Sequence, residues 1–258
     1  MTALHSEVQG SGPDLVLLHG WGMNGAIWHS VEARLAEHYR IHIVDLPGFG
    51  HSPWDSSLSH LSDIALQVRN VVPEHAVWMG WSLGGLVAKQ ACLDFGSQIR
   101  ALITVASSAH FVAKENWPGI KPEVLKGFSA GLQADFSKTL RQFLAIQAMG
   151  SANAKQDIKL LRQQLESRPQ PQLQALELGL NLLQESDLRA RLSEIVVPWL
   201  QIFGHSDSLV PRQARESHGA LHGNIEQCVL RGSSHAPFVS EPEQFCVEVN
   251  TFLRWVLV

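Results

Sequence analysis

The sequence predicts an α/β protein in which a mostly parallel sheet is covered by helices on both faces and carries an inserted helical cap. Short apolar runs alternate with amphipathic helical patterns along most of the chain, as expected of strands buried on both faces. The alternation stops between about Phe111 and Leu192, where helical patterns continue without a convincing strand. The 258 residues, 45% of them hydrophobic, are enough for one large domain. We therefore expect a core of residues 1–110 and 193–258 and a cap of residues 111–192 within a single domain.

The core elements follow from the order of the apolar runs, each of which is bounded by turn residues. We expect strands at residues 15–18, 41–44, 77–79, 102–105, 200–203 and 226–230. The patterns between them predict helices at residues 31–38, 62–71, 83–95, 212–221 and 242–255. Right-handed crossovers would wind this alternation into a sheet with helices on both faces.

The cap segment contains two amphipathic stripes at helical spacing. The first stripe consists of Phe136, Leu140, Phe143, Leu144 and Gln147. The second consists of Ile158, Leu161 and Leu165. Ordinary packing of helices against the core explains most of these residues as well as a ligand site does.

Charge and composition argue against several classes of partner. The formal net charge of −4 and an isoelectric point near 6.3 give no reason to expect nucleic acid or an anionic membrane. We find neither a secretion signal nor an apolar run near the roughly 20 residues that span a bilayer. Three cysteines lie in apolar patterns, as buried thiols do: Cys92, Cys228 and Cys246. We expect a cytoplasmic monomer.

The most informative stretch, residues 77–85, reads as a buried strand that breaks sharply into a helix at Ser82. In a G-x-S-x-G elbow the serine occupies a strained turn, and its neighbours two residues away must be nearly free of side chain so that strand and helix can pass closely. Gly80 and Gly84 meet this need. A serine that merely caps a helix is the alternative at this point.

A serine nucleophile needs a histidine base and a carboxylate that orients it, in the chain order serine, acid, histidine for this kind of elbow. Asp207 follows the apolar run at 199–203, and His235 lies in the loop after the run at 226–230. Both therefore fall at the carboxyl ends of predicted strands, where catalytic groups of open α/β sheets gather. Asp207 alone would fit an ordinary turn. The conjunction predicts a triad of Ser82, Asp207 and His235.

The oxyanion formed by serine attack needs two N–H donors that are already in place. One donor should be the backbone N–H of Leu83, which directly follows the nucleophile at the start of a helix. We assign the other to the backbone N–H of Trp21, because the glycines at positions 20 and 22 free the loop after an earlier strand to turn. His19 is expected to brace that loop by hydrogen bonds.

Five motifs in order resemble the α/β-hydrolase superfamily over nearly the whole chain. They are HGWG at residues 19–22, DLPGFGHS at 45–52, GWSLGG at 80–85, GHSDSLVP at 204–211 and HAPF at 235–238. The resemblance implies the α/β-hydrolase fold. It does not by itself imply a particular substrate.

A narrower resemblance connects the chain with the family of pimeloyl-[acyl-carrier protein] methyl ester esterases of bacterial biotin synthesis. It rests on LHGWG at residues 18–22, GWSLGGLVA at 80–88, TVASS at 104–108, ENWPGIKP at 115–122 and FLAIQAMG at 143–150. The resemblance implies hydrolysis of the methyl ester on a pimeloyl chain tethered to acyl-carrier protein, with release of methanol and the free carboxylate.

The same resemblance implies which residues contact the substrate. By position they are Trp21, Ser82, Leu83, Phe143, Leu144, Ala145, Ile146, Gln147 and His235. Physical reasoning agrees in kind, because a long methylene chain requires an apolar slot. Phe143, Leu144 and Ile146 supply apolar surface, and Gln147 offers a polar contact.

An acidic carrier protein requires a local basic surface on this acidic chain. The candidates for carrier docking are Lys138, Arg141, Lys155, Lys159 and Arg162. Lys155, Lys159 and Arg162 share one helix face by their spacing, and such a face would steer an acidic partner. The family is expected to have arginines here, and lysine lacks their bidentate geometry. A solvated helix face with no partner is the alternative.

The sequence thus predicts a serine carboxylesterase that uses acyl-enzyme chemistry and needs no metal or organic cofactor. A general short-chain carboxylesterase or a C–C bond hydrolase on the same fold is the first alternative. A binding module without catalysis is the second. Epoxide hydrolases and dehalogenases are disfavoured, because they place a carboxylate where this chain has Ser82.

Overall fold

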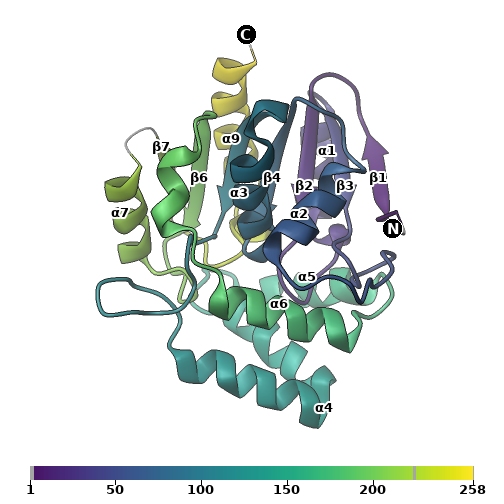
Figure 1. The fold of residues 1–258 in the computed structure, drawn as a ribbon, viewed down its shortest axis with the longest axis vertical. Coiled ribbons are helices and arrows are strands. Elements are labelled where there is room, and N and C mark those ends of the chain that lie inside the picture. Colours follow the sequence, from purple (N-terminus) through teal and green to yellow (C-terminus); the bar gives the residue numbers. More distant parts are fainter. Residues whose placement is uncertain (1–2, 223–224, 258) are drawn as a thin grey trace.

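The computed structural model describes residues 3–222 and 225–257, and within them the chain forms a seven-stranded sheet flanked by helices (Figure 1). The strand order is β1-β3-β2-β4-β5-β6-β7. All neighbouring strands are parallel except β1, which is antiparallel to β3. This arrangement confirms the predicted fold class.

The strands agree with the predicted apolar runs to within a few residues at each end. Their bounds are β1 Ser6–Gln9, β2 Asp14–Leu18, β3 Arg40–Val44, β4 Ala76–Trp81, β5 Ile99–Val105, β6 Trp199–Gly204 and β7 Ile225–Leu230. Every residue of the central strand β4 is buried, which explains why it reads as an unbroken apolar run. The edge strand β1 was not predicted, because it is short, polar and mostly exposed and carries no apolar pattern.

Helices cover both faces of the sheet, with α2 and α3 packed together on one face and α1 and α9 on the other (Figure 1). The core helices are α1 His29–Ala36, α2 Leu61–Arg69, α3 Leu83–Phe95, α7 Arg212–Leu221, α8 Pro237–Ser240 and α9 Pro242–Val256. Short 3₁₀ turns are η1 Gly25–Trp28, η2 Gly96–Gln98 and η3 Arg189–Glu194. Among the residues described, no helix is both long and apolar enough to cross a membrane.

Three further helices lie together beyond one end of the sheet, in the interval where the sequence predicts a cap (Figure 1). They are α4 Pro122–Ala148, α5 Ala154–Glu166 and α6 Leu173–Glu185. Helix α4 bends at Asp135, whose backbone is extended rather than helical. The Asp135 carboxylate accepts a hydrogen bond from the Lys138 N–H at 2.9 Å, so it caps the second half of the helix.

The three cysteines occupy the core elements. Cys92 and Cys246 are buried, whereas Cys228 on the outer strand β7 is half-buried. All three are free thiols.

Candidate functional site

Ser82 lies at the break between β4 and α3 with a backbone φ of 54°, a value that L-residues rarely adopt. The turn is possible because its glycine neighbours permit close backbone contact. A Cβ on Gly84 would lie 2.5 Å from the carbonyl oxygens of Leu18 and His19, and a Cβ on Gly80 would overlap the Gly84 carbonyl. The backbone crossing therefore forces the serine into a strained and fixed position.

The predicted nucleophile, base and acid form one buried chain of hydrogen bonds. The Ser82 hydroxyl lies 2.9 Å from Nε2 of His235, and Nδ1 of the same ring lies 2.8 Å from the Asp207 carboxylate. The side chains of His235 and Asp207 are at most 1% exposed. In this geometry the imidazole accepts the serine proton on one side, and the carboxylate fixes the tautomer on the other.

The loop around Asp207 holds its carboxylate toward the histidine. The oxygen that does not face His235 accepts hydrogen bonds from the backbone N–H groups of Leu209 and Val210, at 2.8 and 3.0 Å. Both oxygens of the carboxylate thus accept hydrogen bonds, and rotation of the side chain would break all three of these bonds. The acid is therefore pre-oriented by the turn that follows β6.

The backbone of His235 is fixed from both the core and the cap. Its carbonyl accepts a hydrogen bond from the Trp81 indole N–H at 2.7 Å. Its own N–H donates to the carbonyl of Gln147, near the end of α4, at 3.0 Å. The position of the base therefore depends on the docking of α4.

Two backbone N–H groups near Ser82 match the predicted oxyanion donors. Leu83 is the first residue of α3, a position whose N–H has no acceptor within its own helix. The N–H of Trp21 makes no hydrogen bond within the described part of the chain. The Trp21 indole N–H is bonded to the Leu176 carbonyl of α6 at 2.9 Å, so the cap also fixes this loop.

His19 braces the Trp21 loop from beneath. Its Nε2 accepts a hydrogen bond from the Leu46 N–H at 2.9 Å, so Nδ1 carries the proton that is shared with the Gly20 carbonyl at 2.8 Å. Complete burial lowers the His19 pKa to about 4, which keeps the ring neutral near neutral pH. A neutral ring can serve as donor and acceptor at once, as these two bonds require.

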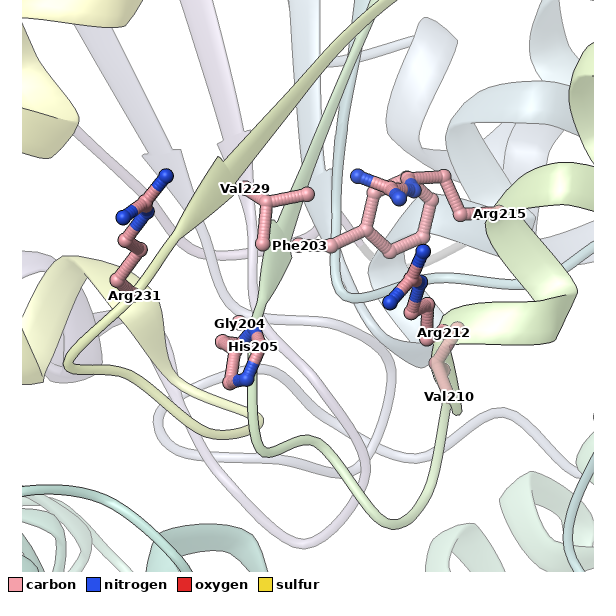
Figure 2. Close-up of a pocket in the computed structure, with 8 residues that line it drawn as sticks. All are labelled: Phe203, Gly204, His205, Val210, Arg212, Arg215, Val229 and Arg231. Atoms are coloured by element: carbon pink, nitrogen blue, oxygen red, sulfur yellow. The ribbon is translucent and has the colours of Figure 1, made fainter.

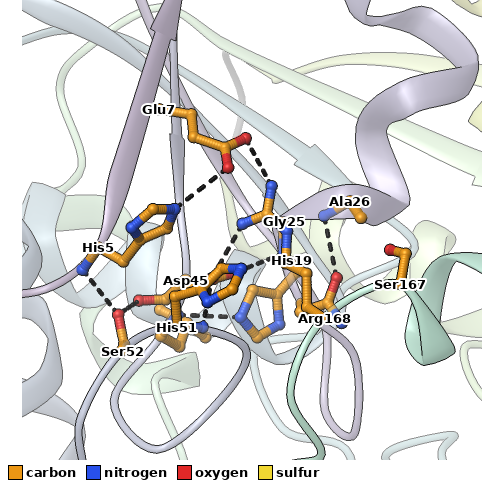
Figure 3. A network of polar contacts seen from close by, with 12 residues as sticks. His5, Glu7, His19, Gly25, Ala26, Asp45, His51, Ser52, Ser167 and Arg168 are labelled. Carbon is orange, nitrogen blue, oxygen red and sulfur yellow. Dashed lines mark hydrogen bonds and ion pairs between the residues drawn. The ribbon is translucent and has the colours of Figure 1, made fainter.

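A buried ion pair connects the cap to the same loops (Figure 3). Arg168, between α5 and α6, donates to the Asp45 carboxylate at 2.9 Å and to Glu7 of β1 at 2.6 Å. Asp45 also accepts the N–H groups of Gly25 and His51. Burial disfavours the ionised carboxylate, but His19, these N–H groups and Arg168 outweigh it and lower the Asp45 pKa.

No local pattern in the sequence predicts the ion pair between Arg168 and Asp45. Arg168 stands in a segment rich in cations, and nothing local distinguishes it from a solvated residue. Its side chain is nonetheless only 5% exposed. The one available hint was the aspartate of the DLPGFGHS motif, an acidic residue directly after a buried strand.

Five of the residues predicted to contact the substrate, residues 143–147, lie on α4 and differ in burial. Phe143 is buried and packs edge-on against Trp21, with ring centroids 4.7 Å apart. Gln147 is buried on the same side, and neither atom of its amide has a hydrogen-bond partner among the described residues. Leu144 is buried and Ile146 half-buried, whereas Ala145 is exposed.

The predicted docking residues all lie exposed on α4 and α5: Lys138, Arg141, Lys155, Lys159 and Arg162. Arg162 pairs with Glu166 one turn along α5 at 2.7 Å. Arg141 and Arg162 flank a hollow of about 150 Å³ whose lining includes the apolar side chains of Leu140, Leu144 and Leu165. Two of the predicted docking cations, one from α4 and one from α5, therefore lie beside the same partly apolar hollow.

A second basic surface lies at the β6–β7 edge of the sheet. It is a pocket of about 500 Å³ lined by Phe203, Gly204, His205, Val210, Arg212, Arg215, Val229 and Arg231. Figure 2 shows Arg212 and Arg215 extending near the ring of Phe203, with Arg231 on the other side of β7. The lining includes none of Ser82, His235 and Asp207, so this pocket is distinct from the site formed by these three hydrogen-bonded residues.

Within the described residues, no group of three or more His, Cys, Asp or Glu side chains is arranged to hold a metal ion. The polar groups around Ser82 are instead an alcohol, an imidazole, a carboxylate and backbone N–H donors. This set provides acid–base and nucleophilic chemistry.

Residues 15–249 match the sequence profile of the alpha/beta hydrolase family, and the chain belongs to this family. Among solved structures, an esterase from Exiguobacterium antarcticum superimposes with a TM-score of 0.86 at 22% identity and covers 97% of this chain and 95% of its own. An enol-lactonase from Burkholderia xenovorans gives 0.85 at 18% identity, covering 97% and 96%. At these identities the likeness shows the fold alone.

Curated relatives are much more similar in sequence. The pimeloyl-[acyl-carrier protein] methyl ester esterase of Aeromonas hydrophila is 50% identical over 95% of this chain and 96% of its own length. The esterases of the same name from Vibrio vulnificus and Pectobacterium carotovorum are 49% and 46% identical, over 97% and 98% of this chain and 98% and 100% of their own lengths. The likeness includes the cap helices as well as the core.

Proposed function

We propose that this chain is a serine carboxylesterase that hydrolyses the methyl ester of pimeloyl-[acyl-carrier protein] in biotin biosynthesis. The observation that carries the proposal is the buried chain from Ser82 through His235 to Asp207, in a protein half identical to esterases of that name over nearly its full length. The products are pimeloyl-[acyl-carrier protein] and methanol.

The first half of the reaction forms an acyl-enzyme. His235 takes the proton of the Ser82 hydroxyl at Nε2 while Ser82 Oγ attacks the ester carbonyl carbon. The backbone N–H groups of Trp21 and Leu83 hold the oxyanion that develops. The intermediate then collapses, the C–O bond to the methoxy group breaks, and His235 returns its proton to that group, so methanol departs.

The second half regenerates the serine. Water enters the site vacated by methanol, gives a proton to His235 and attacks the acyl carbon. The same two N–H groups hold the second oxyanion, and Ser82 leaves with the proton from His235. Asp207 keeps Nδ1 protonated throughout and stabilises the transient imidazolium.

The cap supplies the acyl slot in this proposal. Phe143 and Leu144 present apolar surface suited to a methylene chain, and Phe143 already contacts the Trp21 ring beside the oxyanion donors. The buried amide of Gln147 lacks a protein partner among the described residues, and such a group is costly unless a ligand satisfies it. We assign Gln147 a hydrogen bond to a polar group of the substrate.

The basic surface of α4 and α5 is the proposed docking site for the acyl-carrier protein. On these two helices the five predicted docking residues and Lys126 are exposed, against three exposed carboxylates, Glu123, Asp135 and Glu166. An acidic carrier would be attracted to this surface and steered toward the cap. The adjacent apolar hollow between α4 and α5 supports an entry for the carrier's acyl arm on this side.

Mass spectrometry of carrier-bound pimeloyl methyl ester tests the proposal directly. Incubation with the wild-type chain should lower the mass of the acyl group by that of one methylene, and the Ser82→Ala variant should leave it unchanged. Cleavage of simple acetate esters without cleavage of the carrier-bound ester would indicate a general carboxylesterase. Failure of a fluorophosphonate to label Ser82 would indicate a binding module.

A further inference from the structure

A lysine is completely buried directly behind the serine elbow. Lys89 lies on α3 about two helical turns after Ser82, and its exposed fraction is 0%. Within the described residues its ammonium group has no carboxylate partner. Lys89 Nζ donates a hydrogen bond to the Ser107 hydroxyl at 2.8 Å. Because burial of an unpaired ammonium is costly, a lysine at this position requires an explanation beyond packing.

Ser107 links this lysine to the nucleophile's own peptide group. Its hydroxyl accepts the hydrogen bond from Lys89 Nζ and donates to the Ser82 carbonyl oxygen, also at 2.8 Å. Two structural features hold Ser107 there. Ala106 turns the chain after β5 with a φ of 45°, and Gly85 admits the Ser107 side chain, because a Cβ on Gly85 would lie 2.5 Å from Ser107 Oγ.

The Ser82 carbonyl and the Leu83 N–H belong to the same peptide group. A hydrogen bond that a carbonyl accepts draws electron density away from the amide nitrogen, so the N–H on the other side becomes a stronger donor. The same bond restrains rotation of the peptide plane. The hydrogen bonds from Lys89 to Ser107 and from Ser107 to the Ser82 carbonyl therefore act on the Leu83 N–H, which donates to the oxyanion in the proposed mechanism.

We propose that Lys89 and Ser107 are positioning residues that orient and strengthen the Leu83 N–H as an oxyanion donor. The inference rests on the proposed function, because it assigns Leu83 the oxyanion role. Neither side chain touches the reacting atoms. Their effect passes through the Ser82–Leu83 peptide and acts on the transition state rather than on substrate binding.

The burial of Lys89 makes the strength of its hydrogen bond to Ser107 depend on pH. Burial lowers the Lys89 pKa to about 7. The titratable groups coupled to it are His218 of α7, whose pKa burial lowers to about 3, and Cys92 of α3, whose pKa burial raises. Around neutral pH these two neighbours stay uncharged while Lys89 changes its charge. A charged Lys89 donates more strongly to Ser107 than a neutral one.

The test compares Lys89→Met and Ser107→Ala with a matched control, Thr104→Val. Thr104 is a buried β5 residue whose hydroxyl accepts a hydrogen bond from the Trp199 indole at 3.0 Å, outside the chain that leads to Ser82. For each variant we would measure kcat and KM on a small methyl ester, thermal stability, and the Ki of a trifluoromethyl ketone. This ketone forms an oxyanion on the serine.

Lys89→Met and Ser107→Ala should each lower kcat by about tenfold with little change in KM. This effect is smaller than the roughly 100- to 1,000-fold loss in kcat expected when a whole oxyanion donor is removed. The ketone Ki should rise by the same factor. The ratio of wild-type kcat to Lys89→Met kcat should fall severalfold as the pH rises through about 7, because only the wild type then loses a charged donor to Ser107. Thr104→Val should lower stability and leave kcat and Ki unchanged.

Two outcomes would overturn the inference. One is that both variants keep wild-type kcat and Ki while only their stability changes, as in Thr104→Val. The other is that the ratio of wild-type kcat to Lys89→Met kcat does not change with pH. A wild-type protein that neither hydrolyses esters nor reacts with a fluorophosphonate at Ser82 would instead refute the proposed function, so the two failures are distinguishable.

Discussion

The serine elbow and the helical cap position their functional groups in different ways. At the elbow the contacts are between backbone atoms: Gly80 and Gly84 allow β4, α3 and the end of β2 to touch, and Ser82 adopts its strained φ of 54° as a result. In the cap, long side chains make the connections to the core. Arg168 reaches Asp45, and the Trp21 indole reaches α6.

This difference separates chemistry from selectivity. Backbone packing is stiff and tolerates almost no substitution, so the elbow presents the same hydroxyl and N–H groups whatever the acyl chain. Side-chain connections change with single substitutions, so the cap can be adapted to a new acyl chain or partner while the elbow is kept. The following predictions test that division, from the largest expected effect to the smallest.

Ser82→Ala should lower ester hydrolysis by roughly 10⁴-fold or more, because the nucleophilic hydroxyl is lost. The φ of 54° disfavours alanine as it does serine, so thermal stability should change little. Ser82→Gly should be equally inactive and more stable than Ser82→Ala by up to about 1 kcal/mol, because glycine relieves the strain. Substantial turnover by either variant, or equal stability of both, would contradict the elbow argument.

Arg168→Leu should lower the free energy of unfolding by about 3–5 kcal/mol, because it leaves the fully buried Asp45 carboxylate without its cation. Arg162→Leu is the matched control. Its ion pair with Glu166 is exposed, so the loss should stay below about 1 kcal/mol. Chemical denaturation of both variants measures the contrast. Equal losses would show that the connection between cap and core does not depend on this ion pair.

The stability of the wild-type protein should rise between pH 7 and pH 9. Lys89 has a pKa of about 7 in the folded protein and 10.5 when exposed. Between pH 7 and pH 9 the unfolded chain therefore binds more protons than the folded protein, so a rise in pH favours the folded state. The rise should amount to about 2 kcal/mol, since each pH unit contributes up to about 1.4 kcal/mol. Lys89→Met should be stable at pH 7 and lack the rise. Denaturation midpoints at the two pH values measure it.

Reversal of three cap cations, Lys155→Glu, Lys159→Glu and Arg162→Glu, should lower kcat/KM for the carrier-bound ester by about tenfold at low salt and less at high salt. Turnover of the free dimethyl ester should stay unchanged. The same charge reversal at Arg212, Arg215 and Arg231, beside the β6–β7 pocket, is the control and should have little effect. If both triple variants lose activity equally, overall charge rather than the cap surface attracts the carrier.

Much of the core could be predicted from the sequence because it is encoded in local patterns. Short runs of three to five residues predicted six of the strands, and the loops after them predicted where Ser82, Asp207 and His235 belong. The edge strand β1 was not predicted, because a polar four-residue segment becomes a strand through its pairing with β3 and not through a pattern in its own residues. The burial of Lys89 could not be predicted either, because α3 is enclosed on all sides from Leu83 to Cys92 by segments distant in the sequence.

By itself, the sequence determined the α/β class, the position of the serine elbow and the order of nucleophile, acid and base, because glycine requirements and apolar periodicity are local properties. Only the tertiary structure decided that Arg168 turns inward to Asp45 and that Lys89 is connected to the Ser82 carbonyl through Ser107. The physical reason is that burial and pairing of a charge depend on segments distant in the chain, which no local pattern records.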